Sequence, residues 1–166
     1  QREEALRPFT VDLHQVHHPW SLSPVEAVMS AMVRLIEKKR IRAIGVSNYD
    51  LSRLERAVEA LGKRQRALAT HQIKYSLLDR RIERDGRLEF CRQRGVTTLA
   101  YSPLEQGLLT GKYHDAPETV RTLNPIRRIL PRYRSATLDR VRPVVEVVQQ
   151  VAKAHGATPS QVALAW

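Results

Sequence analysis

The sequence has a single cysteine, Cys91, and no long uncharged apolar run. One cysteine excludes an internal disulfide and is typical of a protein kept in a reducing compartment, where we expect it to fill the core on a helix. No stretch of about 18 uncharged apolar residues occurs, so no membrane-spanning helix is expected. The first residues, from Gln1 to Glu4, resemble neither a signal peptide nor a start methionine. We therefore expect a soluble, cytoplasmic protein without a membrane partner.

Acidic residues are also few, since 17 aspartates and glutamates stand against 28 lysines and arginines, for a formal net charge of +11. A basic surface attracts phosphate, which raises the question of a nucleic-acid partner. Most of the cations lie at predicted helix ends or alternate with acidic residues, and no groove-reading or base-stacking motif is present. We expect no nucleic-acid partner. One basic stretch has little acid beside it, and either a solvated surface or a site for a phosphate-bearing ligand would explain it: Arg121, Arg127, Arg128, Arg132, Arg134, Arg140 and Arg142.

Four strand-like runs are present, over residues 11–17, 41–46, 67–73 and 96–100, and they recur about every 30 residues. Polar residues end each run: His17, Ser47 and Asn48, Gln72, and Tyr101 and Ser102. In a (β/α) barrel the strand interiors build the core, and side chains at the carboxyl ends of the strands make the active site. The pattern predicts an α/β barrel with an enzyme site at this end.

Amphipathic helices are predicted between and after the strands. Ser23, Pro24 and Glu26 suit an N-cap, first turn and capping box, and an apolar stripe follows them to Ile36. Similar patterns predict helices over 51–62, 84–94 and 138–152, and Thr158 begins another with a capping box. Residues 102–136 contain several prolines and glycines and are expected to form a long loop, which in a compact domain is functional or disordered.

In order and at suitable spacing, the strand-end motifs resemble those of the aldo-keto reductase family, in the branch of bacterial general-stress-type reductases and potassium-channel β subunits. The matching runs are VDLHQVH at 11–17, GVSN at 45–48, Gln72 with YSLL at 75–78, AYSPL at 100–104, GLLTGKY at 107–113, TPSQ at 158–161 and ALAW at 163–166. Three positions depart from the family pattern: His14, His71 and Lys74, the last standing where an acidic residue is frequent.

The resemblance implies a (β/α)8 TIM barrel, of which this chain supplies about strands 4 to 7 with their helices. Residues 1–166 are then expected to be a partial barrel domain, truncated at both ends. The family's catalytic tyrosine, lysine and aspartate would precede Gln1, and the segment that binds the adenosine 2′-phosphate would follow Trp166. The isolated fragment is expected to be inactive, because unpaired sheet edges favour aggregation or assembly.

The resemblance also implies an NADP(H)-dependent oxidoreductase that reduces aldehydes and ketones to alcohols by hydride transfer. His17 matches the active-site histidine, whose neutral imidazole would donate to the substrate oxygen. Ser47, Asn48 and Gln72 match residues that hold the nicotinamide carboxamide, and Tyr101 matches the aromatic residue that stacks on the nicotinamide ring.

Further residues match the family's binding site for the rest of the cofactor. Ser102, Pro103, Leu104 and Gly107 match the loop around the pyrophosphate, and Lys112 supplies a cation there. Arg132 and Arg134 lie where related enzymes place basic residues near the cofactor.

Other interpretations of the same residues stay open. A non-catalytic NADP-binding sensor of the channel β-subunit type would keep the cofactor fold, although its relatives tend to lack a histidine at the position of His17. The histidines His14, His17 and His18 suggest a zinc site. In a regular strand, however, side-chain alternation places His17 on the opposite face from His14 and His18. Because catalytic zinc needs about three convergent ligands, no metal is expected. The polar strand ends also suit plain helix caps and rim residues.

Overall fold

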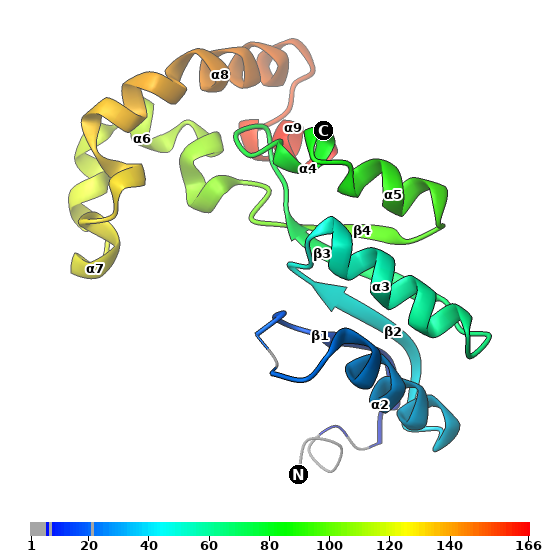
Figure 1. The fold of residues 1–166 in the computed structure, drawn as a ribbon. Helices are drawn as coiled ribbons and strands as arrows, with labels where there is room; N and C mark the ends of the chain where they lie inside the picture. The colour runs from blue at the N-terminus through cyan, green and yellow to red at the C-terminus, as the bar shows by residue number, and fades with distance from the viewer. Residues whose placement is uncertain (1–5, 7, 21) are drawn as a thin grey trace. The chain divides into compact units, whose positions relative to one another are not determined.

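The computed structural model describes residue 6, residues 8–20 and residues 22–166 (Figure 1). The chain divides into two compact units. The first comprises Gln1–Ile73 and Arg81–Ala100, and the second comprises Lys74–Arg80 and Tyr101–Trp166. Each unit is therefore built from two segments of the sequence. The chain passes from the first unit to the second near the carboxyl ends of the third and fourth strands.

The sheet of the first unit contains the four predicted strands in the order in which they occur in the sequence. They are β1 (Val11–Val16), β2 (Ile41–Ser47), β3 (Leu68–Lys74) and β4 (Thr97–Tyr101). The pairs β1–β2 and β2–β3 are parallel, and a register shift between Ile44 and Gly45 interrupts the second pair. Because parallel neighbours run the same way, their carboxyl ends share one edge of the sheet.

Helices α2 (Val25–Glu37), α3 (Leu51–Gly62) and α5 (Arg87–Gln93) lie on one face of this sheet, and α4 (Arg81–Arg84) precedes α5 (Figure 1). Their apolar stripes meet the outward side chains of the strands in one core, which includes Met29, Ile44, Leu54 and Leu61, all fully buried. Cys91 is part of this core at 1% exposure, which confirms its predicted role as a buried helix residue.

Two helix predictions in this unit are wrong in detail. Helix α2 begins at Val25 with Pro24, and not Ser23, at its N-cap, and Pro24 has no side chain that could cap the helix. The Glu26 side chain forms a bidentate ion pair with Arg56 on α3. The helix predicted over 84–94 is broken at Gly86, whose φ of 83° is left-handed and cannot continue a right-handed helix.

The second unit contains the long predicted loop, which forms a succession of short helices. They are η1 (Glu105–Thr110), α6 (Lys112–Asp115), η2 (Pro117–Thr122), α7 (Pro125–Arg128) and η3 (Pro131–Tyr133). A proline opens each of the last three, where its fixed φ suits a first helical turn and its missing N–H costs nothing. The segment has a small core of its own, built on Leu108, Tyr113, Tyr133 and Leu138.

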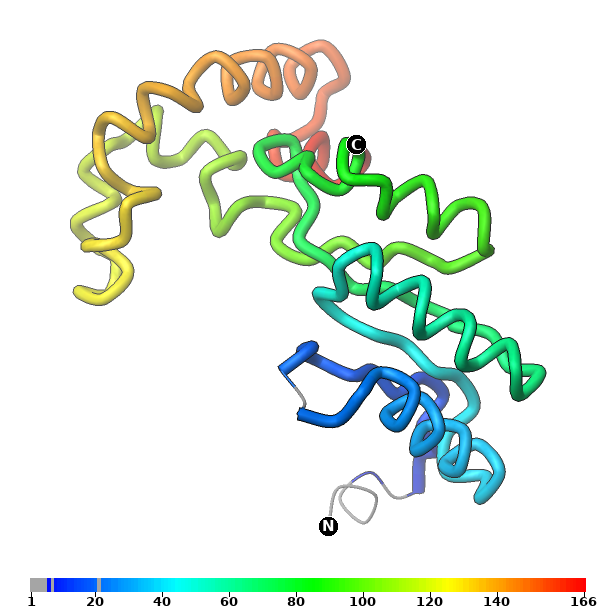
Figure 2. Tube along the Cα trace, viewed as in Figure 1, coloured from blue at the N-terminus to red at the C-terminus, as the bar shows by residue number. Residues whose placement is uncertain are grey.

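Helix α8 (Ser135–Ala154) lies against η1, α6, η3 and α9 (Pro159–Ala165) in this second unit (Figure 2). It confirms the helix predicted from the apolar spacing of residues 138–152. The capping box predicted at the start of α9 is also confirmed, because the Thr158 side chain accepts from the Gln161 N–H while the Gln161 side chain accepts from the Thr158 N–H. In the part of the chain that the structure describes, no helix combines the length and apolar composition needed to cross a bilayer.

Candidate functional site

The carboxyl ends of β1, β2 and β3 bring the first group of predicted site residues together. Ser47 pairs in register with Gln72, two residues beyond the row in which Gln15 pairs with Gly45 and Gly45 with Thr70. Gly45 has no room for a side chain, because an added Cβ would lie 2.2 Å from Thr70 Oγ1 and 2.7 Å from Gln15 Cγ. The Gln15 and Thr70 side chains therefore lie over Gly45, and they form a polar layer beneath the strand ends.

Ser47 and Asn48 occupy the last position of β2 and the residue after it. Ser47 is 1% exposed, and its Oγ accepts a 3.1 Å hydrogen bond from Asn48 Nδ2. Asn48 has a left-handed φ of 59°, and its backbone N–H donates to the Gln72 carbonyl over 2.9 Å. Asparagine tolerates this conformation better than most residues do. The turn out of β2 thus places hydroxyl and amide groups beside the end of β3.

His17 follows β1 as an exposed residue and starts a series of aromatic rings. The His17 and His18 rings are 4.1 Å apart and tilted, and His18 stacks on Trp20 at 4.1 Å with nearly parallel planes. His18 Nδ1 lies 3.4 Å from Asn48 Nδ2, which ties the end of β1 to the turn after β2. The structure therefore groups His17 with Ser47, Asn48 and Gln72 at one edge of the first unit.

The second group of predicted residues lies in the second unit, after β4. The Tyr101 carbonyl accepts a 3.4 Å hydrogen bond from the Tyr75 N–H. The following segment, residues 102–107, has four residues with left-handed backbones: Ser102 (φ 56°), Glu105 (φ 46°), Gln106 (φ 54°) and Gly107 (φ 98°). Non-glycine residues in this region are strained, and such strain concentrates at ligand-binding segments. We call residues 102–107 the turn loop.

Lys112 lies directly beside Gly107 of the turn loop. A Cβ on Gly107 would meet Lys112 Cε at 3.1 Å, Lys112 Nζ at 3.4 Å and the Tyr113 ring at 3.2 Å. The ammonium also lies 4.7 Å from the centre of the Tyr113 ring, a cation-π distance. A flexible cation is therefore held over a bare stretch of backbone, which suits an anionic ligand.

An arginine that contacts the turn loop, Arg127, is not one of the two predicted to lie near the cofactor. Arg127 donates to Gln106 Oε1 over 3.3 Å, and the Tyr133 hydroxyl donates to the Gln106 carbonyl over 3.1 Å. Arg132 is half-buried in η3, and Arg134 is exposed at the N-cap of α8. Neither Arg132 nor Arg134 forms an ion pair with any residue in the described ranges, so both keep charge available to a ligand.

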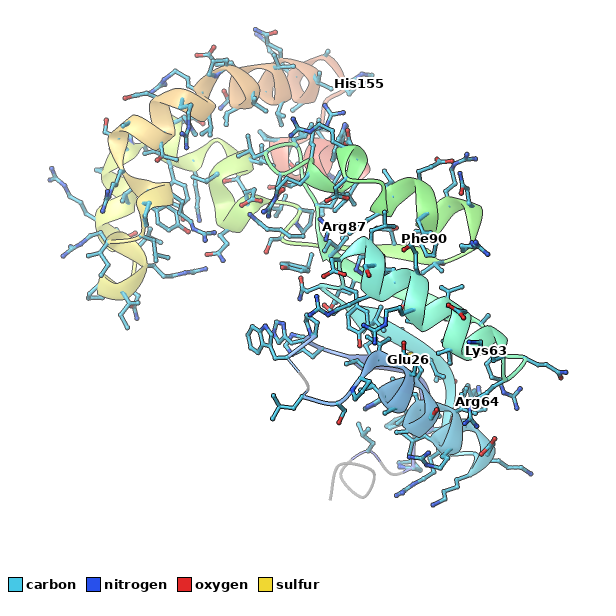
Figure 3. The ribbon with its side chains drawn as sticks, in the orientation of Figure 1. Glu26, Lys63, Arg64, Arg87, Phe90 and His155 are labelled. Atoms are coloured by element: carbon cyan, nitrogen blue, oxygen red, sulfur yellow. The ribbon has the colours of Figure 1, made fainter. Side chains whose placement is uncertain are left out.

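One residue next to Gln72 points away from the strand-end group and into the core. His71 is 1% exposed, and its Nδ1 lies 3.9 Å from the Cys91 sulfur. Burial, and then the nearby Arg87 guanidinium, lower the pKa of His71 to about 4 (Arg87 is labelled in Figure 3). Burial likewise raises the pKa of the Cys91 thiol. Cys91 is thus a protonated core residue, since reactive cysteines sit in exposed, electropositive surroundings.

Two hollows on the helix side of the first unit lie apart from the strand-end residues. One of about 590 Å³ lies between α2 and α3 and is lined by Glu26, Lys63 and Arg64, among others (Figure 3). One of about 890 Å³ lies between α3 and α5 beside Phe90. Long charged side chains line both hollows, and some of these charges are paired, as in the ion pair of Lys63 with Glu59. This arrangement is expected of solvated helix faces.

The sequence model of the aldo/keto reductase family matches residues 3–166. The chain therefore belongs to this family, and the resemblance inferred from the strand-end motifs is confirmed. An uncharacterized oxidoreductase of Mycobacterium tuberculosis is 36% identical over 158 residues, which cover 94% of this chain and 46% of that protein. The L-glyceraldehyde 3-phosphate reductase of Escherichia coli K12 is 32% identical, over 94% of this chain and 45% of its own length.

Solved structures agree with this assignment. The glycerol dehydrogenase of Gluconobacter oxydans is similar with a TM-score of 0.82 at 28% identity, over 98% of this chain and 47% of that one. A thermostable aldo-keto reductase bound to the inhibitor epalrestat is similar with a TM-score of 0.65 at 35% identity, over 92% of this chain and 43% of that one. These relatives are TIM barrels, so the predicted α/β barrel fold is confirmed, and the chain spans less than half the length of the proteins it matches.

Proposed function

We propose that this chain is part of an NADP(H)-dependent oxidoreductase that reduces aldehydes or ketones to alcohols. The observation that carries the proposal is the grouping of His17, Ser47, Asn48 and Gln72 at the carboxyl ends of three adjacent parallel strands. That edge is where barrel enzymes of this fold perform their chemistry. A family relative in Schizosaccharomyces pombe, 32% identical over 94% of this chain, carries NADP(+) in its name.

The residues of the first unit fit the nicotinamide end of such a cofactor. A primary carboxamide has two donor hydrogens and one acceptor oxygen, and the Ser47 hydroxyl with the Asn48 and Gln72 amides offers both kinds of partner. Ser47 is almost fully buried, so its hydroxyl position is well defined. The bound cofactor supplies the hydride, and these side chains orient the ring that carries it.

The residues of the second unit fit the phosphate end. Lys112 provides a cation beside Gly107, where the absence of a side chain lets the Lys112 ammonium lie close to the backbone. Ser102, Pro103 and Leu104 precede it in the turn loop, and we propose that this backbone and Lys112 bind the diphosphate. We propose that the Tyr101 ring packs on the nicotinamide, and that Arg132 and Arg134 add positive charge for the phosphates.

His17 is the proposed catalytic residue of this chain. Its imidazole is exposed at the end of β1 and can donate a hydrogen bond to a carbonyl oxygen, orienting the substrate and favouring charge on that oxygen as hydride arrives. No residue in 1–166 matches the tyrosine that the family uses to deliver the proton. We therefore assign His17 to orientation and polarisation, and expect little or no turnover from residues 1–166 alone.

The test is to purify the full-length protein, titrate NADPH, and follow NADPH oxidation with a panel of small aldehydes and ketones. We expect NADPH binding and substrate-dependent oxidation. NADPH binding without turnover on any substrate would favour the alternative function, a non-catalytic NADP-binding sensor or regulatory subunit. A protein that binds no NADPH would contradict both.

A further inference from the structure

A buried ion pair joins the end of β3 to the turn loop within the second unit. Lys74 Nζ lies 2.7 Å from Glu105 Oε1, and the Glu105 side chain is only 6% exposed. The Lys74 ammonium also lies 3.5 Å from Asp79 Oδ2, on a side chain that is 11% exposed. Carboxylates this buried are strongly destabilising unless a cation and hydrogen bonds compensate them. Lys74 therefore compensates the negative charge of the buried Glu105 carboxylate, which belongs to the turn loop.

Ser76 fixes the direction of this contact. Its Oγ accepts from the backbone N–H groups of Leu78 and Asp79 over 3.2 and 3.1 Å, and it donates to Glu105 Oε1 over 3.0 Å. A hydroxyl has one hydrogen and two lone pairs, so these three bonds use all of its capacity. The turn from Ser76 to Asp79 is closed by two backbone hydrogen bonds as well. Glu105 thus binds to a firmly ordered turn.

Glu105 is also one of the strained residues of the turn loop. Its φ is 46° and that of Gln106 is 54°, in the left-handed region that residues with a side chain avoid. Such a conformation persists only where surrounding contacts over-determine it. The buried side-chain contacts of Glu105 supply that constraint at the first of the two positions.

The same constraint reaches the part of the loop proposed to bind phosphate. Gln106 follows Glu105 and is held by Tyr133 and Arg127 through its carbonyl and side chain, and Gly107 comes next, under Lys112. Releasing Glu105 would let the backbone relax toward ordinary φ values. The Gly107 backbone would then no longer keep its present conformation beside Lys112.

We propose that Lys74, Ser76 and Glu105 are positioning residues that preset the turn loop and thereby raise the affinity for the cofactor's diphosphate. This inference rests on the proposed function, since it names how the same loop is held ready for its ligand. Preorganisation acts by removing the cost of ordering the loop when the ligand binds, so its loss weakens affinity more than turnover.

The test compares four variants of the full-length protein with the wild type: Lys74→Met, Lys74→Arg, Ser76→Ala, and the double variant Lys74→Met with Glu105→Gln. Lys63→Met is the matched control, because Lys63 makes a 2.7 Å ion pair with Glu59 on side chains that are 72% and 67% exposed. Two quantities are measured: amide hydrogen exchange of residues 104–109 without nucleotide, and NADPH affinity together with the KM for NADPH and kcat.

We expect Lys74→Met to speed exchange in the turn loop and to weaken NADPH binding by about tenfold, with the loss appearing in KM rather than kcat. Ser76→Ala should weaken binding in the same direction, and Lys74→Arg should stay near the wild type. The double variant should recover most of the affinity, since it no longer leaves the Glu105 carboxylate buried without its cation. Lys63→Met should leave loop exchange and affinity unchanged.

Unchanged loop exchange in Lys74→Met and Ser76→Ala would overturn the inference, and so would faster exchange with unchanged NADPH affinity. If Lys74→Met does not fold, the comparison of Ser76→Ala with Lys74→Arg tests the inference through the same two measurements, loop exchange and NADPH affinity. A wild type that binds no NADPH would overturn the proposed function and, with it, the affinity role. That failure is distinguishable, because the exchange differences among the variants would persist.

Discussion

The backbone N–H of Asn48 donates a 2.9 Å hydrogen bond to the carbonyl of Gln72, and it does so from a left-handed backbone with φ of 59°. This bond closes the ladder between β2 and β3 at its last position. It also turns the chain sharply, so that the Asn48 amide returns over Ser47. The conformation and the amide can be tested separately, because glycine and alanine remove the same amide and differ in their tolerance of a positive φ.

Asn48→Gly should therefore be more stable than Asn48→Ala, by about 1 kcal/mol, since alanine at a positive φ is strained and glycine is not. Both variants lose the hydrogen bonds of the amide, so both should weaken NADPH binding to a similar extent. Urea unfolding and NADPH titration measure the two effects. An alanine variant as stable as the glycine variant would show that the turn after β2 differs from the one described.

Gly45 should not accept even one additional methyl group. Its added Cβ would meet Thr70 Oγ1 at 2.2 Å and Gln15 Cγ at 2.7 Å, so Gly45→Ala should destabilise the protein by about 1 to 3 kcal/mol. Gly62 at the end of α3 is the matched control, because a Cβ there meets nothing within 4 Å. Gly62→Ala should be neutral or stabilise by up to about 1 kcal/mol. Equal stabilities of the two variants in urea unfolding would contradict the packing of this polar layer.

His71 should make the protein less stable in mild acid. Burial lowers its pKa in the folded state from 6.5 to about 4, so between these values the unfolded chain binds a proton that the folded chain does not. The contribution of neutral His71 to the free energy of unfolding is fully present above pH 6.5. It is lost as the pH falls toward 4, a change of about 3 kcal/mol.

The measurement for His71 is the free energy of unfolding between pH 4 and 7. His71→Asn should flatten the pH dependence in this range, because asparagine does not titrate. His155→Asn is the control, since His155 is an exposed residue after α8 (Figure 3). A pH dependence identical in the wild type and His71→Asn would refute the buried, neutral state of His71.

Lys112→Met should raise the dissociation constant of NADPH by about tenfold, because one phosphate contact of a point charge is lost while the alkyl packing over Gly107 is kept. Lys153→Met, on the exposed face of α8, should have no effect. The affinity of the wild type for NADPH should also fall with added salt, and that of Lys112→Met should fall less. Equal affinities of Lys112→Met and the wild type would remove Lys112 from the proposed site.

Much of the fold is readable from local sequence patterns. The strands were predicted within one residue at either end, because apolar runs of this length bounded by polar residues suit buried parallel strands. The break of the 84–94 helix at Gly86 was missed, since the charged residues on both sides continue a helical pattern. The short helices of residues 102–136 were missed as well, although Pro117, Pro125 and Pro131 each mark a first turn.

The contacts that hold the turn loop were beyond sequence reasoning. Lys74 stood out as a departure from the family pattern, but its partner Glu105 lies 31 positions later, and nothing local pairs the two. Arg127 was one of seven arginines in a basic stretch, and only the fold selects it for contact with Gln106. Long-range ion pairs depend on how elements pack, whereas strand ends and helix caps depend on neighbours in sequence.

The most direct test of the central claim, that the polar strand ends form the active edge of a reductase, is the single-turnover rate of NADPH oxidation by an aldehyde in the full-length wild type and in His17→Ala. We predict that His17→Ala lowers this rate by about 100-fold or more, as loss of a positioned hydrogen-bond donor does, while the NADPH dissociation constant stays within about twofold. A His17→Ala variant that turns over as fast as the wild type would contradict the claim.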